Sequence, residues 1–397
     1  LQAPVLDHPG RGLREAAVGV DRGVPGREFR PELSGGSGYS MSRNHGGHQV
    51  LAERELLLHV GTHKTGTTAI QAYMSQCRME LAAQGILYPS LRPGLWNERE
   101  AHHKVAQAVL RSSLIDRVRL RRYRRWIDQA QAWARLTVLS AEPIYRHTVG
   151  DVTPGDLSAW FTAHRNYLRR LAAWLAGFDV RSVVYFRQPE DLAISMYKEH
   201  VVRRLLAGDK RHFASFIAMT APYYEYSRHV DALRDTLGDV VVRDYAAANR
   251  LGLQTDFAAL VGAANLPPPA RAAVRTSPGN RATLWLAAQP AGRSRRDHVR
   301  RTLFALRVES AGPFIEAGPT TLWPDRATFE GFVERHRAAW DLPFLSLPAW
   351  CDLPAATWTA DDHAAAEVAF RDWQARNIDL LQRREANKLT FYDPDPA

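Results

Sequence analysis

Residues 55–68 read Glu55-Leu56-Leu57-Leu58-His59-Val60-Gly61-Thr62-His63-Lys64-Thr65-Gly66-Thr67-Thr68. Their first part, 55–60, is a short apolar run that is typical of a strand buried inside a sheet. A loop with two glycines follows, and apolar side chains then recur at helical spacing: Ile70, Tyr73, Met74, Cys77 and Leu81. The stretch therefore predicts a buried strand, a glycine-bearing turn and an amphipathic helix.

This arrangement is suited to binding phosphate. The first turn of a helix leaves its backbone N–H groups without partners, and the helix dipole favours an anion there. Gly61 and Gly66 let the backbone curl around such a ligand, and Thr67 and Thr68 add hydroxyl groups at the first helical turn. We predict that residues 61–68 bind a phosphate-bearing ligand.

Strands alternate with helices further along the chain. Apolar runs at Leu136–Ser140, Ser182–Phe186 and Asp239–Arg243 predict three more strands. Helices are expected at Arg99–Ser113, Arg117–Trp133, Phe161–Phe178, from Pro189 onward, and at Tyr224–Leu237. This order indicates an α/β fold, in which a central parallel sheet is covered by helices on both faces. Ligands of such sheets bind at the carboxyl ends of the strands, here after Val60, Ser140 and Phe186.

The position of the loop lysine distinguishes residues 61–68 from a Walker A sequence. That pattern places a lysine directly after the second glycine, whereas here Thr67 follows Gly66 and the lysine is residue 64. A P-loop nucleotide kinase or hydrolase is one alternative hypothesis, and a non-catalytic nucleotide-binding protein is another.

The loop resembles the 5'-phosphosulfate loop of bacterial sulfotransferases, which are themselves similar to carbohydrate sulfotransferases. The resemblance implies a P-loop-type three-layer fold and the cofactor 3'-phosphoadenosine 5'-phosphosulfate (PAPS). It also implies that Lys64 is catalytic, because the loop lysine of the family stabilises the leaving group. The cofactor contacts implied for the loop are Thr62, His63, Lys64, Thr65, Gly66, Thr67 and Thr68.

A second segment, Phe186–Ser195, looks like the 3'-phosphate site of the same family. It has an arginine at a strand end, a Pro-x-Asp start of a helix, and a serine further along that helix. By resemblance, Arg187 and Ser195 bind the 3'-phosphate, and a guanidinium group can fork onto a phosphate. The Arg-Lys-Gly segment of cytosolic sulfotransferases is missing, and Arg275 and Asn280 occupy a similar place along the chain.

Sulfuryl transfer to a hydroxyl group also needs a base for the acceptor proton. The family takes its base from a His or Glu in a segment after the loop, and His102 is the first candidate because histidine titrates near neutral pH. A surface helix with exposed His102 and His103 is the alternative interpretation. Glu142, just after the strand 136–140, is the second catalytic candidate, although it could instead fix a loop by accepting backbone hydrogen bonds.

Charge gives a further indication about partners. The 52 basic and 42 acidic residues leave a net charge of +10, which favours an anionic partner. A run of arginines could dock an anionic glycan or could form a solvated helix face; its members are Arg117, Arg119, Arg121, Arg122, Arg124 and Arg125. The sequence has neither a nucleic-acid-binding module nor a metal-ligand spacing, so we expect neither partner. The expected acceptor is a small molecule or a glycan.

The 397 residues can form one large domain with additions. Residues 1–40 are rich in Gly and Pro and read as a disordered tail, with Met41 as the expected natural start. We predict a core over 55–265 and a helical C-terminal extension, packed on that core, over 266–397. The chain has two cysteines and no apolar run of about 18 residues, which favours a cytoplasmic protein without a transmembrane segment.

Overall fold

The computed structural model describes residues 54–90, 100–150, 152–153, 155–203, 212–269, 277–290, 294–308, 312–316 and 318–387. The chain divides into two units, Leu1–Glu53 and Arg54–Ala397. All described residues belong to the second unit, so the predicted tail 1–40 lies outside them. No helix in the described ranges is long and apolar enough to cross a membrane.

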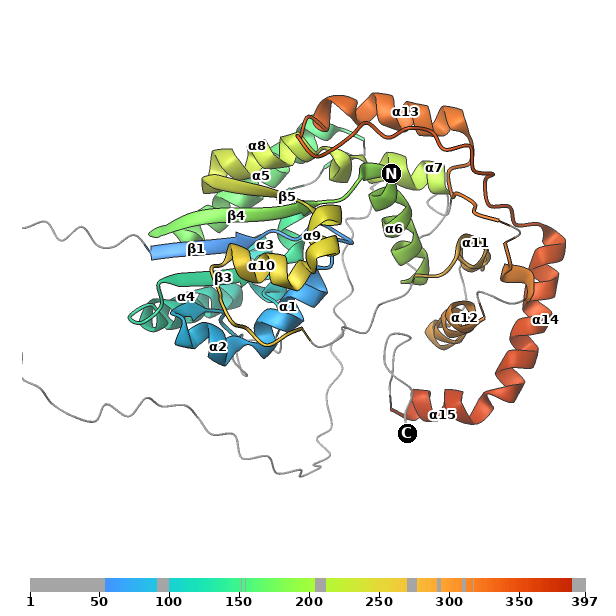
Figure 1. Cartoon of the computed structure of the whole chain (residues 1–397), viewed down its shortest axis with the longest axis horizontal. Coiled ribbons are helices and arrows are strands. Elements are labelled where there is room, and N and C mark those ends of the chain that lie inside the picture. The colour runs from blue at the N-terminus through green and yellow to red at the C-terminus, as the bar shows by residue number, and fades with distance from the viewer. Residues whose placement is uncertain are drawn as a thin grey trace, which may run out of the picture. The chain divides into compact units, whose positions relative to one another are not determined.

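A parallel sheet lies at the centre of this second unit, with the strand order β2-β3-β1-β4-β5 (Figure 1). Its strands are β1 (Arg54–His59), β2 (Ile86–Leu87), β3 (Leu136–Ser140), β4 (Phe178–Phe186) and β5 (Asp239–Asp244). In the middle strand β1, His59 pairs with Ser140 of β3 and with Val183 of β4. The α/β class with a central parallel sheet is confirmed, and the three strand ends expected to bind ligands belong to adjacent strands.

Helices cover both faces of the sheet. Successive side chains of β1 point to opposite faces, and they belong to two different core clusters. Leu57 belongs to a core cluster that includes α1 (Thr67–Gln76), α2 (Arg78–Ala83), α9 (Tyr245–Leu251) and α10 (Leu253–Leu260). Leu56 and Leu58 belong to a larger cluster on the other face. That cluster includes α3 (His103–Arg111), α4 (Leu114–Ala130), α5 (Leu157–Leu175), α6 (Pro189–Val202) and α8 (Tyr226–Leu237).

Some elements differ from the sequence-based expectation. The helix expected over 70–81 is two helices, because α1 ends at Gln76 and α2 begins after Cys77. Strand β4 begins at Phe178 rather than Ser182, and Phe178 pairs with Arg54 of β1 instead of ending the preceding helix. Strand β2 escapes prediction because a two-residue strand carries no periodic signal.

The described residues after 277 contain α11 (Asn280–Ala287), α12 (Arg295–Arg307), α13 (Arg326–His336), α14 (Ala360–Arg376) and α15 (Ile378–Ala386). They share the larger core cluster through side chains such as Trp285 and Trp340. The Trp340 indole N–H donates to the Tyr224 carbonyl at 2.7 Å, and His336 Nδ1 lies 2.6 Å from the Glu225 carboxylate. The end of α13 and the residues just after it therefore pack against Tyr224 and Glu225, which precede α8.

Candidate functional site

The loop after β1 turns sharply before α1 begins. The Val60 N–H still donates to the Val183 carbonyl at 2.8 Å, so the sheet bonding continues to that point. Lys64 and Gly66 then adopt left-handed backbone conformations, with φ of 61° and 68°. A Cβ atom on Gly66 would also collide with the Leu253 side chain of α10, so both space and backbone conformation favour glycine there.

Buried threonine hydroxyl groups hold the loop in this shape. Thr62 Oγ1 donates to the Tyr185 carbonyl of β4 at 2.6 Å, and Thr65 Oγ1 donates to the Thr62 carbonyl at 2.9 Å. Thr67 is buried as well, and its hydroxyl lies 3.5 Å from the Thr62 carbonyl. These three residues, which the resemblance makes cofactor contacts, therefore use their hydroxyl groups within the protein.

The N-terminus of α1 is open to a ligand. No side chain caps it, and its first backbone bonds run from Ala69 and Ile70 to the Gly66 carbonyl, at 2.8 and 3.2 Å. The N–H groups of the preceding residues have no acceptor inside the helix, as in any first turn. The Thr68 side chain is exposed beside them. The start of α1 therefore offers donors and a positive dipole end to an anion.

Lys64 is a half-buried cation without a carboxylate in contact. Among the described residues, no hydrogen bond or ion pair holds its ammonium group. Burial lowers its pKa from the usual 10.5, and the charges of Arg203 and Arg187 lower it further, against the opposing effects of Glu199 and Glu142. Since an isolated cation in such surroundings is unfavourable, an anionic ligand would stabilise it.

Arg187 follows β4, the strand to which the loop is bonded through Thr62 and Tyr185, so the structure brings the two sequence motifs to one edge of the sheet. Its guanidinium group lies 3.5 Å from the Asp191 carboxylate and 5.9 Å from the ring centre of Tyr245. Ser195 is half-buried on α6, and its hydroxyl group has no partner among the described residues. The helix α6 begins at Pro189 without a side-chain cap, so a second open helix end lies beside Arg187.

His102 has a structural environment that the sequence did not reveal. Its Nε2–H donates to the Pro89 carbonyl at 2.7 Å, and its Nδ1 accepts from the Ser140 N–H at 3.0 Å. Burial is the main reason that its pKa falls from 6.5 to about 4. Both ring nitrogens are therefore engaged with backbone groups, and His102 holds the end of β3 to residue 89. These contacts do not favour the predicted base role of His102.

Glu142 pairs with His63, across the ends of β3 and β1. Their Oε1 and Nδ1 atoms lie 2.5 Å apart, and His63 Nε2 lies 3.4 Å from a guanidinium nitrogen of Arg146. Burial would raise the pKa of Glu142, but His63, Arg146 and His103 outweigh it and hold this pKa at about 2. The pair escapes sequence reasoning because its members become neighbours only once β1 and β3 are known to be adjacent.

His59 is a fully buried residue that the sequence analysis did not single out. It ends β1, its Nδ1 lies 2.8 Å from the Ser140 hydroxyl, and burial lowers its pKa to about 3. Gln71 of α1 donates to the same hydroxyl at 3.1 Å. These contacts join β1, β3 and α1 beneath the loop, so we assign them to the support of the site.

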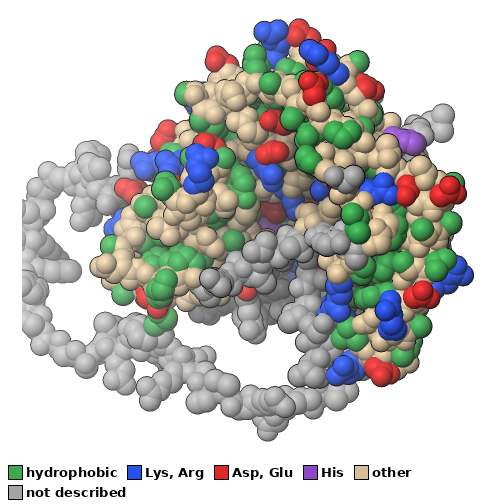
Figure 2. Space-filling view, turned by 45° about the vertical axis from the view of Figure 1, so that its right-hand side comes forward, with side chains coloured by type: hydrophobic (Ala, Val, Ile, Leu, Met, Phe, Trp, Pro, Cys, Tyr) green, Lys and Arg blue, Asp and Glu red, His purple; other side chains and the backbone are tan. Residues whose placement is uncertain are grey.

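In the space-filling view, basic and acidic side chains surround a hollow near the middle of the face shown (Figure 2).

The arginine run lies on α4, where its members have different environments. Arg124 is committed to the fold, because it donates to Asp128 and to the carbonyls of Trp174 and Ala176 at 2.8–3.0 Å. The side chains of Arg117, Arg121, Arg122 and Arg125 are exposed.

Asn280, one of the two residues that occupy the place of the missing Arg-Lys-Gly segment, donates to the Thr320 carbonyl at 3.0 Å. The other, Arg275, lies outside the described residues.

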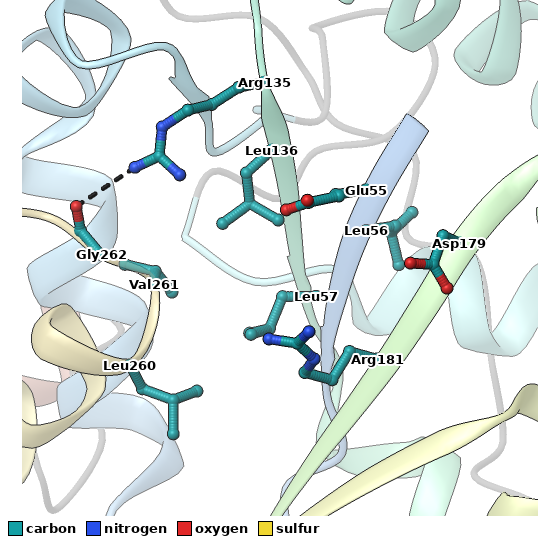
Figure 3. A pocket seen from close by; sticks show the side chains of 10 residues that line it. All are labelled: Glu55, Leu56, Leu57, Arg135, Leu136, Asp179, Arg181, Leu260, Val261 and Gly262. Atoms are coloured by element: carbon teal, nitrogen blue, oxygen red, sulfur yellow. Dashed lines mark hydrogen bonds between the residues drawn. The ribbon is translucent and has the colours of Figure 1, made fainter. Parts of the chain in front are cut away.

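A cavity of about 150 Å³ opens at the amino ends of the strands, the edge opposite the loop (Figure 3). Its lining includes Glu55 of β1, Asp179 and Arg181 of β4, and Arg135, which donates to the Gly262 carbonyl at 3.2 Å. None of the predicted site residues lines it. Within the described ranges, no group of three or more His, Cys, Asp or Glu side chains is placed to hold a metal ion.

Comparison with known proteins adds little to this geometry. No model of a known protein family matches the chain, and no curated protein matches it. A crystal structure of a sulfotransferase from Alicyclobacillus acidocaldarius matches with 17% identity and a TM-score of 0.34. The match covers 64% of this chain and 96% of the other. A likeness at this level assigns neither the fold nor the activity.

Proposed function

We propose that this protein transfers a sulfuryl group from PAPS to a hydroxyl acceptor. One observation carries the proposal. Lys64, which has no ion pair among the described residues, lies in the loop after β1, and that loop is hydrogen-bonded through Thr62 to the end of the adjacent strand β4, which Arg187 follows. Lys64 and Arg187 each adjoin a helix N-terminus without a side-chain cap. A ligand with anionic groups at two separate positions fits such a pair of sites, and PAPS carries a 5'-phosphosulfate and a 3'-phosphate.

The 5'-phosphosulfate would lie over the start of α1. Backbone N–H groups of the first turn and the exposed Thr68 hydroxyl would bind its phosphate oxygens. Negative charge develops on the bridging oxygen as the sulfur–oxygen bond breaks, and the Lys64 ammonium group would stabilise that charge. Because Lys64 makes no ion pair with the described residues, it can approach this oxygen without first breaking a contact.

The 3'-phosphate would lie at the second site. Arg187 would fork onto it, in exchange for its long contact with Asp191, and the Ser195 hydroxyl would donate from α6. This site distinguishes PAPS from ATP, which has no phosphate at that position. In the same proposal, residues 55–265 form the catalytic core and residues 266–397 the extension, and the acceptor is a small molecule or a glycan.

Calorimetric titration with adenosine 3',5'-bisphosphate, without added metal, tests this proposal. We expect binding of the bisphosphate and much weaker binding of ATP. Replacing Arg187 by Ala should weaken bisphosphate binding by about 10- to 100-fold, since hydrogen bonds to charged groups contribute roughly 1.5–3 kcal/mol.

The matched control is Arg181→Ala. Arg181 lies on the same strand β4 but lines the cavity at the opposite edge, so its loss should leave bisphosphate binding unchanged. Preference for ATP with Mg²⁺, or binding of neither nucleotide, would contradict the proposal. Equal effects of the two arginine substitutions would place the phosphate site elsewhere.

A further inference from the structure

His63, which is buried, forms a close pair with the half-buried Glu142. Glu142 is ionised at neutral pH, and an ionised carboxylate only accepts hydrogen bonds. The 2.5 Å contact therefore requires that His63 carries a proton on Nδ1. In a neutral imidazole this leaves the lone pair on Nε2, the nitrogen that faces away from Glu142. The pair thus has the arrangement of a histidine base oriented by a carboxylate.

Several groups face this imidazole from the elements packed around it. Glu142 and Arg146 belong to the segment after β3, and Tyr223, whose ring centre lies 5.9 Å from that of His63, follows α7 (Phe213–Met219). His103 of α3 acts on Glu142, and His200 of α6 acts electrostatically on His63. Arg146 is exposed and contacts Nε2 only at 3.4 Å, so an entering acceptor can displace it.

The competing bases are less suitable as they lie in this structure. His102 has both nitrogens bonded to backbone groups. Glu142 alone is a weak base, because its pKa of about 2 makes it a poor proton acceptor at neutral pH. His103 lies against Gln71, with 3.3 Å between their side-chain nitrogens. His63, by contrast, precedes Lys64 directly in the loop, so a base there stands next to the group that stabilises the leaving oxygen.

We infer that His63 is the general base of the sulfuryl transfer and that Glu142 is its positioning residue, an inference that rests on the proposed function. The acceptor hydroxyl gives its proton to His63 Nε2 while its oxygen bonds to sulfur. The bond between sulfur and the bridging oxygen breaks, and its electron pair stays with the oxygen. Adenosine 3',5'-bisphosphate leaves, with Lys64 beside the new negative charge, and the imidazolium later returns its proton to water.

The test measures release of adenosine 3',5'-bisphosphate from PAPS, with water, phenol or a hexose supplied as the acceptor. His63→Ala should slow release by about 10²- to 10⁴-fold at pH 8, the usual contribution of a general base. Added imidazole should restore part of the rate. The wild-type rate should fall as the pH is lowered, because protonated imidazole accepts no proton, and this acid limb should vanish in His63→Ala.

Glu142→Gln should slow release less than His63→Ala and should keep an acid limb, because the base is still present although the carboxylate no longer stabilises the imidazolium. The exposed His212 is the matched control, and His212→Ala should keep the wild-type rate and pH profile. The resemblance implies that His63 contacts the cofactor, but its ring nitrogens face Glu142 and Arg146 in this structure. Calorimetry should therefore show that His63→Ala binds adenosine 3',5'-bisphosphate within about threefold of wild type, a difference below 1 kcal/mol.

The inference would be overturned if His63→Ala retained the wild-type rate, or if that variant lost the rate but kept the acid limb. It would also be overturned if His102→Ala or His103→Ala abolished the acid limb. Wild-type protein that binds the bisphosphate but releases none from PAPS would also overturn it, while leaving the cofactor site intact. If wild-type protein binds no bisphosphate at all, the proposed function itself fails, and the inference fails with it.

Discussion

At the scale of single residues, Gly66 combines a positive φ of 68° with close contact to Leu253. Gly66→Ala should therefore destabilise the protein by about 2–4 kcal/mol, as the sum of a left-handed backbone cost of roughly 1–2 kcal/mol and an overpacking cost. Urea unfolding measures this loss, and calorimetry should show weaker bisphosphate binding because the loop shifts.

Gly150 separates the two causes. Its φ is 95°, but a Cβ there would have no neighbour within 4 Å. Gly150→Ala should show the backbone cost without the collision and should leave bisphosphate binding unchanged. Equal losses in the two variants would mean that Leu253 moves aside freely.

Buried His164 predicts a pH-dependent stability. Burial lowers its pKa from 6.5 to about 4, and its Nδ1 lies 2.8 Å from the His147 carbonyl. The unfolded chain takes up this proton near pH 6.5 and the folded chain only near pH 4, so stability is present above pH 6.5 and falls as the pH decreases between these values. By this linkage, one such histidine costs about 2 kcal/mol between pH 7 and pH 5.

Urea unfolding at pH 5, 6 and 7 checks this expectation. In His164→Gln the loss of stability on acidification should be smaller than in wild type by about that 2 kcal/mol. His212→Gln should leave the slope unchanged, because His212 is exposed. An unchanged slope in His164→Gln would show that His164 is not neutral in the folded protein.

The residues of the candidate site were predictable to different degrees. Lys64 and Arg187 could be found because each belongs to a local strand–loop–helix pattern. His102 lies where the resemblance expects a base, but its bonds to Ser140 and Pro89 depend on chain segments that no local pattern relates. The partnership of His63 with Glu142 likewise depends on the order of strands in the sheet.

At the scale of elements, apolar periodicity predicts the long helices and four of the strands described here, because burial on one face repeats over many residues. Boundaries were less predictable. The sequence shows no reason for the break at Cys77, where the backbone leaves helical geometry with φ −90° and ψ 20°. The extra residues of β4 are decided by pairing with β1 rather than by their own pattern.

At the scale of the whole molecule, described residues before 265 and after 277 share one apolar cluster, so we expect Arg54–Ala397 to unfold together. Trp340 is 4% exposed, and Trp340→Ala should cost about 3–5 kcal/mol, as other large truncations in cores do. Urea unfolding followed by far-ultraviolet circular dichroism should show one transition that moves as a whole to lower urea.

Trp133, which is 50% exposed, provides the control, and Trp133→Ala should change stability by less than about 0.5 kcal/mol. Two separate transitions in Trp340→Ala, with only one displaced, would instead identify 266–397 as an independent domain.

The hydrogen bond from Thr62 to the Tyr185 carbonyl has a consequence for biosynthesis. The loop consists of the consecutive residues 61–68, but its shape depends on Tyr185 of β4, which lies 123 positions after Thr62 in the chain. Such distant contacts form late, because a long segment must be ordered before they can close. A ribosome-bound chain that stops before β4 would carry the whole loop sequence but would lack the proposed binding site. Capture of nascent chains of increasing length on immobilised adenosine 3',5'-bisphosphate would therefore show at which chain length β4 has paired with β1.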